Sequence, residues 1–233
     1  MAEPLIQTIG LKKFFDIDKK TKLHAVDGVD LAIHKGTTLG VVGESGCGKT
    51  TLGRTVLGLL RATDGKIIYS GKDITHVTGK EYAQLRQEMQ IIFQDPYSSI
   101  NPRHSIKKTI GEPLLVNKII RNKKERESKV LVLMETVGLA SRFADSYPHE
   151  LDGGRRQRVG IARALAVNPR FIVCDEPVSA LDVSIQAQVL NLLMDLQDQM
   201  GLTYMFITHD LSVVRHISTE IAVMYLGQCI ERA

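Results

Sequence analysis

The chain has 233 residues, of which 43% are hydrophobic, and a formal net charge of +4 at pH 7. This length can bury the core of one large domain or of a domain with a subdomain, and so small a charge argues against a surface that holds nucleic acid or lipid by charge alone. No segment approaches the ~20 apolar residues of a membrane span, and the first residues lack the pattern of a signal peptide. We therefore expect any action at a membrane to depend on partner proteins. Cys47, Cys174 and Cys229 are far apart and lack CxxC spacing, which predicts reduced thiols in a cytosolic protein.

Three apolar segments before residue 38 predict short strands of an antiparallel β-layer. Polar turns separate them, the first at residues 16–22 and the second at Asp27-Gly28. Phe14 or Phe15, at the end of the first strand, is available to stack on a planar ligand such as adenine, and an aromatic at the solvent edge of the core fits the pattern nearly as well. The predicted strands cover residues 5–15, 23–26 and 29–34.

Residues 43–50 have the pattern GxxxxGK[ST], between an apolar strand predicted over residues 38–42 and a helix predicted over residues 52–60. The glycines let successive backbone N–H groups point inward, and the helix adds its positive end, so the loop can cradle the α- and β-phosphates of a nucleotide. We expect Lys49 to reach the β- and γ-phosphates and the Thr50 hydroxyl to bind Mg²⁺. The predicted nucleoside triphosphate site comprises Gly43, Glu44, Ser45, Gly46, Cys47, Gly48, Lys49, Thr50 and Thr51.

Residues 105–147 carry no strand signals, and their apolar residues recur at helical spacing. We expect two helices, over residues 106–116 and 126–137, with a polar linker over residues 118–124. A basic cluster here, interrupted by two glutamates, could contact nucleic acid or lipid headgroups, but it is more typical of a solvated helix face. The cluster comprises Arg121, Lys123, Lys124 and Arg126.

Strand and helix signals alternate around the glycine-rich loop, which predicts a mostly parallel α/β sheet. Further strands are predicted over residues 65–69, 90–93, 171–174, 203–207 and 221–225. Further helices are predicted over residues 80–89, 153–167, 184–200 and 210–216.

Two acids directly follow the apolar run 171–174, at the carboxyl end of a buried strand, where ligands bind in open α/β sheets. We expect Asp175 to hold Mg²⁺, directly or through water, and Glu176 to polarise a water against the γ-phosphate. His209 ends the next strand at the same edge of the sheet, and this position favours γ-phosphate sensing over a structural role. Gln94, also just past a strand, offers an oxygen to Mg²⁺ and an amide to water.

These motifs, in this order, resemble the nucleotide-binding domain of an ATP-binding-cassette (ABC) transporter over essentially the whole chain. The resemblance implies the ABC ATPase fold: an α/β phosphate-loop NTPase core with a mostly parallel sheet, an N-terminal antiparallel β-layer and a helical subdomain. It implies a single nucleotide-binding domain over residues 1–233. Within it, residues 1–104 and 168–233 form the RecA-like core with the β-layer, and residues 105–167 form the helical subdomain with the signature helix.

The same resemblance implies a role for each motif residue. Phe15 becomes the adenine-stacking residue, Gln94 the Q-loop glutamine, Asp175 the end of the Walker B motif, Glu176 the catalytic glutamate and His209 the switch histidine. The implied metal ligands are Thr50, Gln94 and Asp175. A signature motif falls at Leu151, Asp152, Gly153, Gly154 and Arg155, and a D-loop at Ser179, Ala180, Leu181 and Asp182.

The segments FQDPYSSINPR, residues 93–103, and YPHEL, residues 147–151, resemble the dipeptide, oligopeptide and nickel importer branch of the family. This implies a peripheral ATPase on the cytoplasmic face of the cell membrane, with ATP and Mg²⁺ as cofactors. The implied partners are a second nucleotide-binding subunit, identical or paralogous, and two integral membrane permease subunits, contacted by residues 105–147. A solute-binding protein takes part indirectly, and no nucleic acid is implied. Members usually have a longer C-terminal tail, so we interpret Ala233 as a cut at the tail boundary.

The signature, usually LSGGQ, reads LDGGR here. In the family its serine and glycine amides bind the γ-phosphate of ATP on the opposite subunit when two domains close head to tail. Two unit charges ~4 Å apart repel by ~4 kcal/mol at an effective dielectric constant of about 20, against ~0.5–1.5 kcal/mol for the neutral hydrogen bond lost. We therefore expect normal ATP binding but impaired closure and hydrolysis, unless Arg155 compensates. As an alternative, Asp152 caps the helix that follows.

Two other classes of function fit parts of the sequence. A soluble cassette protein of translation or DNA repair usually has tandem cassettes or long coiled coils, which this chain lacks. A non-hydrolysing regulatory module is suggested by Asp152. The retention of Lys49, Asp175, Glu176 and His209 argues against that second alternative.

Overall fold

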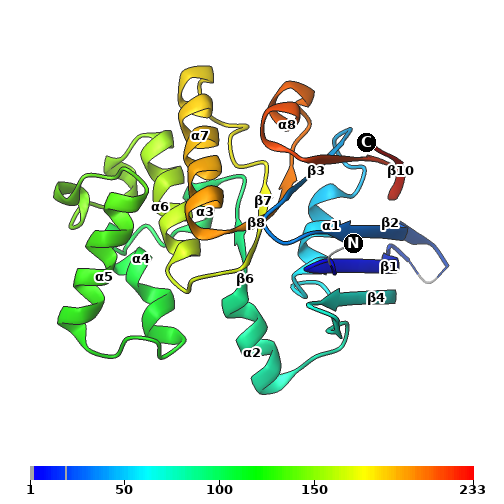
Figure 1. Ribbon diagram of the computed structural model, residues 1–233, viewed down its shortest axis with the longest axis horizontal. Helices are drawn as coiled ribbons and strands as arrows, with labels where there is room; N and C mark the ends of the chain where they lie inside the picture. The colour runs from blue at the N-terminus through cyan, green and yellow to red at the C-terminus, as the bar shows by residue number, and fades with distance from the viewer. Residues whose placement is uncertain (1–2, 19) are drawn as a thin grey trace.

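Two β-sheets and a group of helices make up the protein, as a computed structural model that describes residues 3–18 and 20–233 shows (Figure 1). The strands are β1 (Ile6–Asp16), β2 (Lys22–Ile33), β3 (Thr38–Gly43), β4 (Asp64–Tyr69), β5 (Lys72–Asp73), β6 (Met89–Ile92), β7 (Phe171–Asp175), β8 (Thr203–Ile207), β9 (Glu220–Tyr225) and β10 (Gln228–Arg232). A six-stranded sheet has the order β10-β9-β3-β8-β7-β6 and is parallel except for the pair of β10 with β9. An antiparallel sheet has the order β2-β1-β4-β5. The predicted mostly parallel sheet and antiparallel layer are confirmed.

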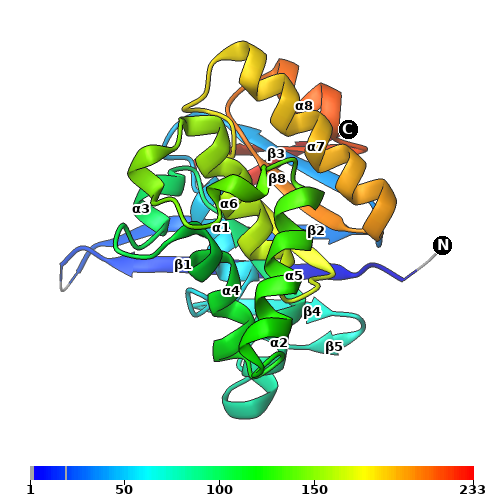
Figure 2. The ribbon, with the colours of Figure 1, turned by 90° about the vertical axis from the view of Figure 1, so that its left-hand side faces the viewer.

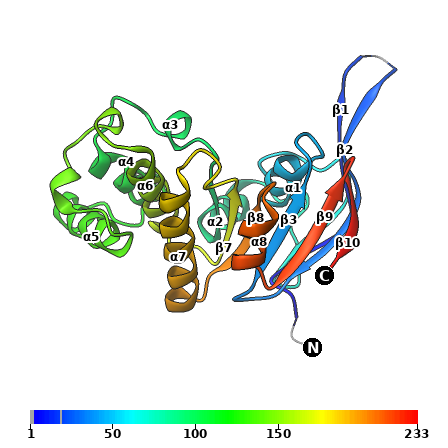
Figure 3. The ribbon, with the colours of Figure 1, turned by 90° about the horizontal axis from the view of Figure 1, so that it is seen from above.

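The helices complete the chain order. They are α1 (Lys49–Val56), α2 (Gly79–Glu88), α3 (Pro96–Ser99), α4 (Ile106–Val116), α5 (Lys123–Thr136), α6 (Gly153–Leu165), α7 (Val183–Met200) and α8 (Leu211–Ile217), with 3-10 turns at Ser141–Phe143 and Pro148–Glu150. Figure 2 shows α4, α5 and α6 together in front of the sheets. Seen from above, the β1–β2 hairpin projects at the end of the molecule opposite α5 (Figure 3).

The parallel sheet separates two hydrophobic cores, because β7 and β8 bury both faces. Side chains alternate in direction along a strand, so neighbours contribute to different cores. Ile172 and Phe206 pack with the helices α4 to α7, whereas Val173 and Ile207 pack with α1 and the antiparallel sheet. This double burial explains the continuous apolar runs in the sequence and fixes the strand ends that carry the polar residues described below.

Glycine permits a close helix-to-strand contact beside the glycine-rich loop. A Cβ atom at Gly40 on β3 would lie 2.1 Å from Cγ2 of Val214 and 2.4 Å from Oγ of Ser218. Helix α8 therefore packs directly on the β3 backbone, and a larger residue at position 40 would displace it.

Three predictions of element boundaries were wrong by more than two residues. The expected strands 23–26 and 29–34 are one strand, β2, which passes Asp27-Gly28 through an irregularity in its register with β1. The helix expected over residues 52–60 is α1, which starts at Lys49 and ends at Val56 because Gly58 has φ +68°. Helix α5 starts before residue 126 because the Asn122 side chain accepts hydrogen bonds from the Lys124 and Glu125 amides. Strands β5 and β10 and helix α3 were not predicted.

Candidate functional site

The glycine-rich loop lies at the carboxyl edge of the parallel sheet, between β3 and α1. Gly48, the residue before α1, has φ +106°, and a Cβ there would lie 2.0 Å from the Ala25 carbonyl oxygen. Only glycine therefore fits at this position. Lys49 is buried, and its Nζ donates hydrogen bonds of 2.8 Å to the Gly43 and Glu44 carbonyl oxygens, which folds the side chain back over the loop. A phosphate group offers this ammonium stronger charged acceptors than those two carbonyls.

Asp175 ends β7 beside the loop and is only 2% exposed. The Thr50 hydroxyl donates a hydrogen bond of 2.6 Å to its Oδ1, and a guanidinium nitrogen of Arg54 lies 3.6 Å from its Oδ2. Burial raises the pKa of the Asp175 carboxyl, and the Thr50 bond and Arg54 oppose that rise. A carboxylate and a hydroxyl this close are hard oxygen ligands of the kind that Mg²⁺ prefers, so these residues fit the ion.

We expect Asp175→Asn to raise the free energy of unfolding at pH 7. Because the pKa of Asp175 is raised by folding, its stabilising contribution is complete below the unfolded pKa and is lost as pH rises through the folded pKa. The ionised carboxylate therefore costs stability at pH 7, and asparagine keeps an acceptor for Thr50. Urea denaturation without nucleotide or Mg²⁺ measures the difference, which should shrink towards pH 4. A less stable variant at pH 7 would contradict this reasoning.

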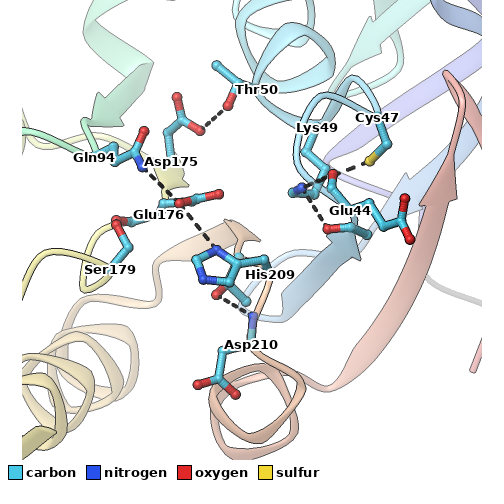
Figure 4. A network of polar contacts seen from close by, with 12 residues as sticks. Glu44, Cys47, Lys49, Thr50, Gln94, Asp175, Glu176, Ser179, His209 and Asp210 are labelled. Atoms are coloured by element: carbon cyan, nitrogen blue, oxygen red, sulfur yellow. Dashed lines mark hydrogen bonds and ion pairs between the residues drawn. The ribbon is translucent and has the colours of Figure 1, made fainter.

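Two predicted residues from other segments of the chain, Gln94 and His209, lie beside Glu176 (Figure 4). The Gln94 amide nitrogen donates a hydrogen bond of 2.9 Å to Oε2 of Glu176, and Nδ1 of His209 lies 3.4 Å from the same oxygen. The Glu176 backbone has φ +48°, an uncommon conformation for glutamate, and is held by hydrogen bonds from its amide to Ile207 and from the Ser179 hydroxyl to its carbonyl. This strained turn aims the carboxylate away from the sheet, towards the loop.

A cavity of about 740 Å³ joins these groups. It is wide enough for a nucleotide-sized ligand. Phe15 lines it, with the Lys13 ammonium 4.8 Å from its ring centroid, whereas Phe14 stacks on His24 at 3.8 Å. The position of Phe15 makes it the ring that remains available to a base. The lining residues are Phe15, Leu23, His24, Ala25, Ser45, Gly46, Cys47, Gly48, Lys49, Thr50, Thr51, Gln94, Glu176, His209, Leu226 and Gly227.

Residues 151–155 do not line this cavity and lie instead at the start of α6. Asp152 caps α6: its Oδ1 accepts a hydrogen bond of 2.7 Å from the Arg155 amide, and its Oδ2 lies 3.0 Å from the Arg155 guanidinium. The Arg155 guanidinium is also 4.8 Å from the Phe143 ring centroid. Residues 179–182 form a turn near the same helix end, since a Cβ at Gly153 would touch Leu181. Within one chain, these two predicted motifs lie together, apart from the loop.

Several cavity residues carry no sequence motif. Leu226 and Gly227, in the turn between β9 and β10, form one wall because the Gly227 amide donates a hydrogen bond of 2.9 Å to the Cys47 carbonyl. Arg54 follows Thr50 by four residues, one helical turn, and that spacing could have indicated its place beside Thr50.

Among the helices of residues 3–18 and 20–233, none combines the length and the apolar character that a membrane span requires.

Comparisons with known proteins agree with these motifs. The family model described as "ABC transporter" matches residues 26–179. The oligopeptide transport ATP-binding protein OppF of Bacillus subtilis is 51% identical, over 100% of this chain and 76% of its own length. The dipeptide transport ATP-binding protein DppF of Haemophilus influenzae is also 51% identical, over 98% of this chain and 71% of its own length. A solved dimer of the ATP-binding cassette MJ0796, bound to ADP and phosphate, is 27% identical with a TM-score of 0.88, covering 98% of this chain and 97% of that chain.

Proposed function

Since this chain belongs to the ABC transporter family, as an ATP-hydrolysing nucleotide-binding subunit of the peptide-importer branch, we propose that it energises uptake of dipeptides or oligopeptides at the cytoplasmic face of the cell membrane. One observation carries the proposal: the phosphate loop and a Glu176 with two polar partners line one cavity, and Thr50 of that loop donates a hydrogen bond to the buried Asp175. Peptide is the leading solute, because the relatives are named for oligopeptide and dipeptide transport. Nickel is the second candidate.

In the proposed mechanism, the loop amides and Lys49 bind the phosphates of ATP. Thr50 and Asp175, with Gln94, would hold Mg²⁺, which would supply positive charge to the triphosphate. Glu176 accepts a proton from the attacking water, and Gln94 and His209 contact the same oxygen of its carboxylate. Phe15 stacks on the adenine.

The active unit is proposed to be a head-to-tail pair of nucleotide-binding subunits. Residues 151–155 lie outside the cavity of their own chain, so they are free to face the nucleotide of a second subunit. The solved dimer of the related cassette, bound to ADP and phosphate, supports a pair of subunits. Within the proposed helical subdomain, residues 105–167, a groove of about 410 Å³ between α4 and α5 is the proposed contact for a permease segment.

Asp152 is proposed to weaken closure of that pair. Its carboxylate is more than half exposed, so it is available to a nucleotide on the opposite subunit, whose γ-phosphate it would repel. The ion pair of 3.0 Å with Arg155 reduces this repulsion, but the Arg155 guanidinium is then bound to Asp152. In the free subunit the aspartate is harmless, because it caps α6.

We expect Phe15→Ala to raise the dissociation constant for ATP about two- to tenfold, since stacking between aromatic rings contributes ~0.5–1.5 kcal/mol beyond buried area. Isothermal titration of the purified subunit with ATP measures it. The matched control is Phe14→Ala, because the Phe14 ring packs on His24 and does not line the cavity. An equal loss in both variants would show that the hairpin as a whole, and not the Phe15 ring, supports binding.

Transport by the assembled complex tests the function. The tagged chain should copurify with two polytopic membrane proteins, and proteoliposomes with that complex and its solute-binding protein should take up labelled dipeptide or oligopeptide when ATP is supplied on the side of this subunit. Glu176→Gln should abolish uptake. Uptake of nickel and not peptide would select the second solute. Purification of the tagged chain without any membrane protein would favour a soluble cassette protein instead.

A further inference from the structure

Two arginines of α6 contact residues 93–99, the segment that contains Gln94. Arg163 donates hydrogen bonds of 2.5 Å to the Ser99 carbonyl and of 3.2 Å to the Ser99 hydroxyl, and its guanidinium lies 6.0 Å from the Phe93 ring centroid. Two turns earlier on the same helix, the Arg156 guanidinium lies 5.2 Å from the Tyr97 ring centroid. Residues seven apart share one face of a helix, so both arginines hold one side of the segment 93–99.

The Arg163 contact is largely enclosed by protein. Burial lowers the pKa of the Arg163 guanidinium, and Glu112 on α4 is the charge that opposes this effect. Glu112 is in turn 3.9 Å from Nδ1 of His104. Removing a guanidinium from water is unfavourable unless its donors are bonded, so Arg163 stays in place only while Ser99 accepts from it. The contact is therefore a fixed link, whereas an exposed pair could exchange partners freely.

The two linked parts carry different halves of the proposed machinery. At one end, Gln94 bonds to Glu176 in the cavity. At the other, α6 begins directly after Asp152, which lies outside the cavity. Neither Arg156 nor Arg163 lines the cavity. A contact with the nucleotide at Gln94 could thus reach residues 151–155 only through an intervening structure. The segment 93–99 held by α6 is one such structure, and the turn 179–182, whose Leu181 packs against Gly153, is the other.

We propose that Arg163, assisted by Arg156, is a positioning residue that makes the segment 93–99 and α6 move as one body. This inference rests on the proposed function, because that function assigns Gln94 to the nucleotide of this chain and residues 151–155 to the nucleotide of the partner. Arginine suits the task, since its planar fork bonds two Ser99 oxygens at once. Lysine could bond one of them.

The test compares Arg163→Met, Arg163→Lys and a matched control, Arg158→Met. Arg158 lies on the same helix and donates one hydrogen bond to the Val137 carbonyl at the end of α5, so its loss removes an α6 contact without touching residues 93–99. In Arg163→Met we expect the backbone amides of residues 93–104, apart from Pro96 and Pro102, to exchange hydrogen at least tenfold faster, with the control unchanged there. The ATP dissociation constant should stay within twofold, because Arg163 is outside the cavity.

The coupling itself is read from hydrogen exchange with saturating ATP. In the natural chain ATP should protect both the loop, residues 43–50, and the start of α6, residues 153–158. In Arg163→Met only the loop should be protected, with an intermediate result for Arg163→Lys. Protection of both regions in Arg163→Met, or no response of residues 153–158 in the natural chain, would overturn the proposal. Neither outcome depends on turnover, so a failure of ATP hydrolysis remains a separate result.

Kinetics of the assembled complex provide a second test of the proposal. Arg163→Met should lower kcat about fivefold with little change in KM, and should add less than twofold to the loss caused by Gln94→Ala, since both changes interrupt one link. If the losses of the two single variants multiply in the double variant, Arg163 merely supports the fold, and the coupling role is rejected. Equal losses in the Arg158 control would reject it as well.

Discussion

Glu176→Gln should lower ATP turnover by roughly 10²- to 10⁴-fold, the range expected when a positioned general base is removed. Glutamine has nearly the shape of glutamate and can still bond to Gln94 through its carbonyl oxygen, so the main change is the loss of a group that accepts a proton. The positive φ of residue 176 is retained, because both residues have the same backbone requirements. ATP binding should therefore persist.

Single-turnover hydrolysis of radiolabelled ATP, with isothermal titration for ATP binding, measures both effects. Glu135→Gln is the matched control, since Glu135 lies exposed on α5 and does not line the cavity. A loss below tenfold in Glu176→Gln would move the general base to another residue, and His209, 3.4 Å from the Glu176 carboxylate, would be the first to examine.

The parts of the site that the sequence predicted are those set by short-range patterns. Residues 43–50 form a glycine-rich turn before α1, and local glycine geometry was sufficient to predict that turn; phosphate binding there remains a prediction. Asp175 and His209 were placed at one edge because parallel strands end on the same side, and the register of β7 with β8 bears this out: Asp175 pairs with Ile207, two residues before His209. Their catalytic and metal-binding roles remain predictions.

Other parts depended on contacts that no local pattern encodes. The choice between Phe14 and Phe15 could not be made from two adjacent aromatics, because their directions depend on the pairing of β1 with β2, which has irregular register. In the structure Phe14 packs on His24, and Phe15 faces the cavity. The wall formed by Leu226 and Gly227 was likewise invisible, since it arises from the β9–β10 turn reaching back to Cys47 across most of the chain.

Position 152 shows how the structure changes a prediction based on charge alone. From the sequence we expected Asp152 to repel a γ-phosphate, with helix capping as the alternative. The structure shows the capping bond and also an ion pair with Arg155, whose guanidinium lies 4.8 Å from the Phe143 ring centroid. Because the charges of residues 152 and 155 cancel, neither residue can be judged alone, and single substitutions at the two positions should have opposite effects.

We therefore expect Arg155→Gln to lower ATP turnover about ten- to hundredfold, because it leaves the Asp152 carboxylate unpaired towards the γ-phosphate of the opposite subunit. At an effective dielectric constant of about 20, a like charge at ~4 Å costs ~4 kcal/mol. Exposure of both groups to solvent reduces this energy. Asp152→Ser should raise turnover about tenfold, because serine keeps the helix cap and removes the charge. The double variant should resemble Asp152→Ser.

Turnover at saturating ATP, measured for the four proteins at low and high salt, completes the cycle. An effect of charge should shrink as salt increases, whereas loss of a cap should not. Thermal unfolding of the isolated subunit provides the control: since Asp152 and serine both cap α6, the midpoint should change little in Asp152→Ser. Equal turnover of the natural chain and Asp152→Ser would mean that the Arg155 pair already cancels the repulsion, and the aspartate would then be a tolerated cap and not an inhibitory charge.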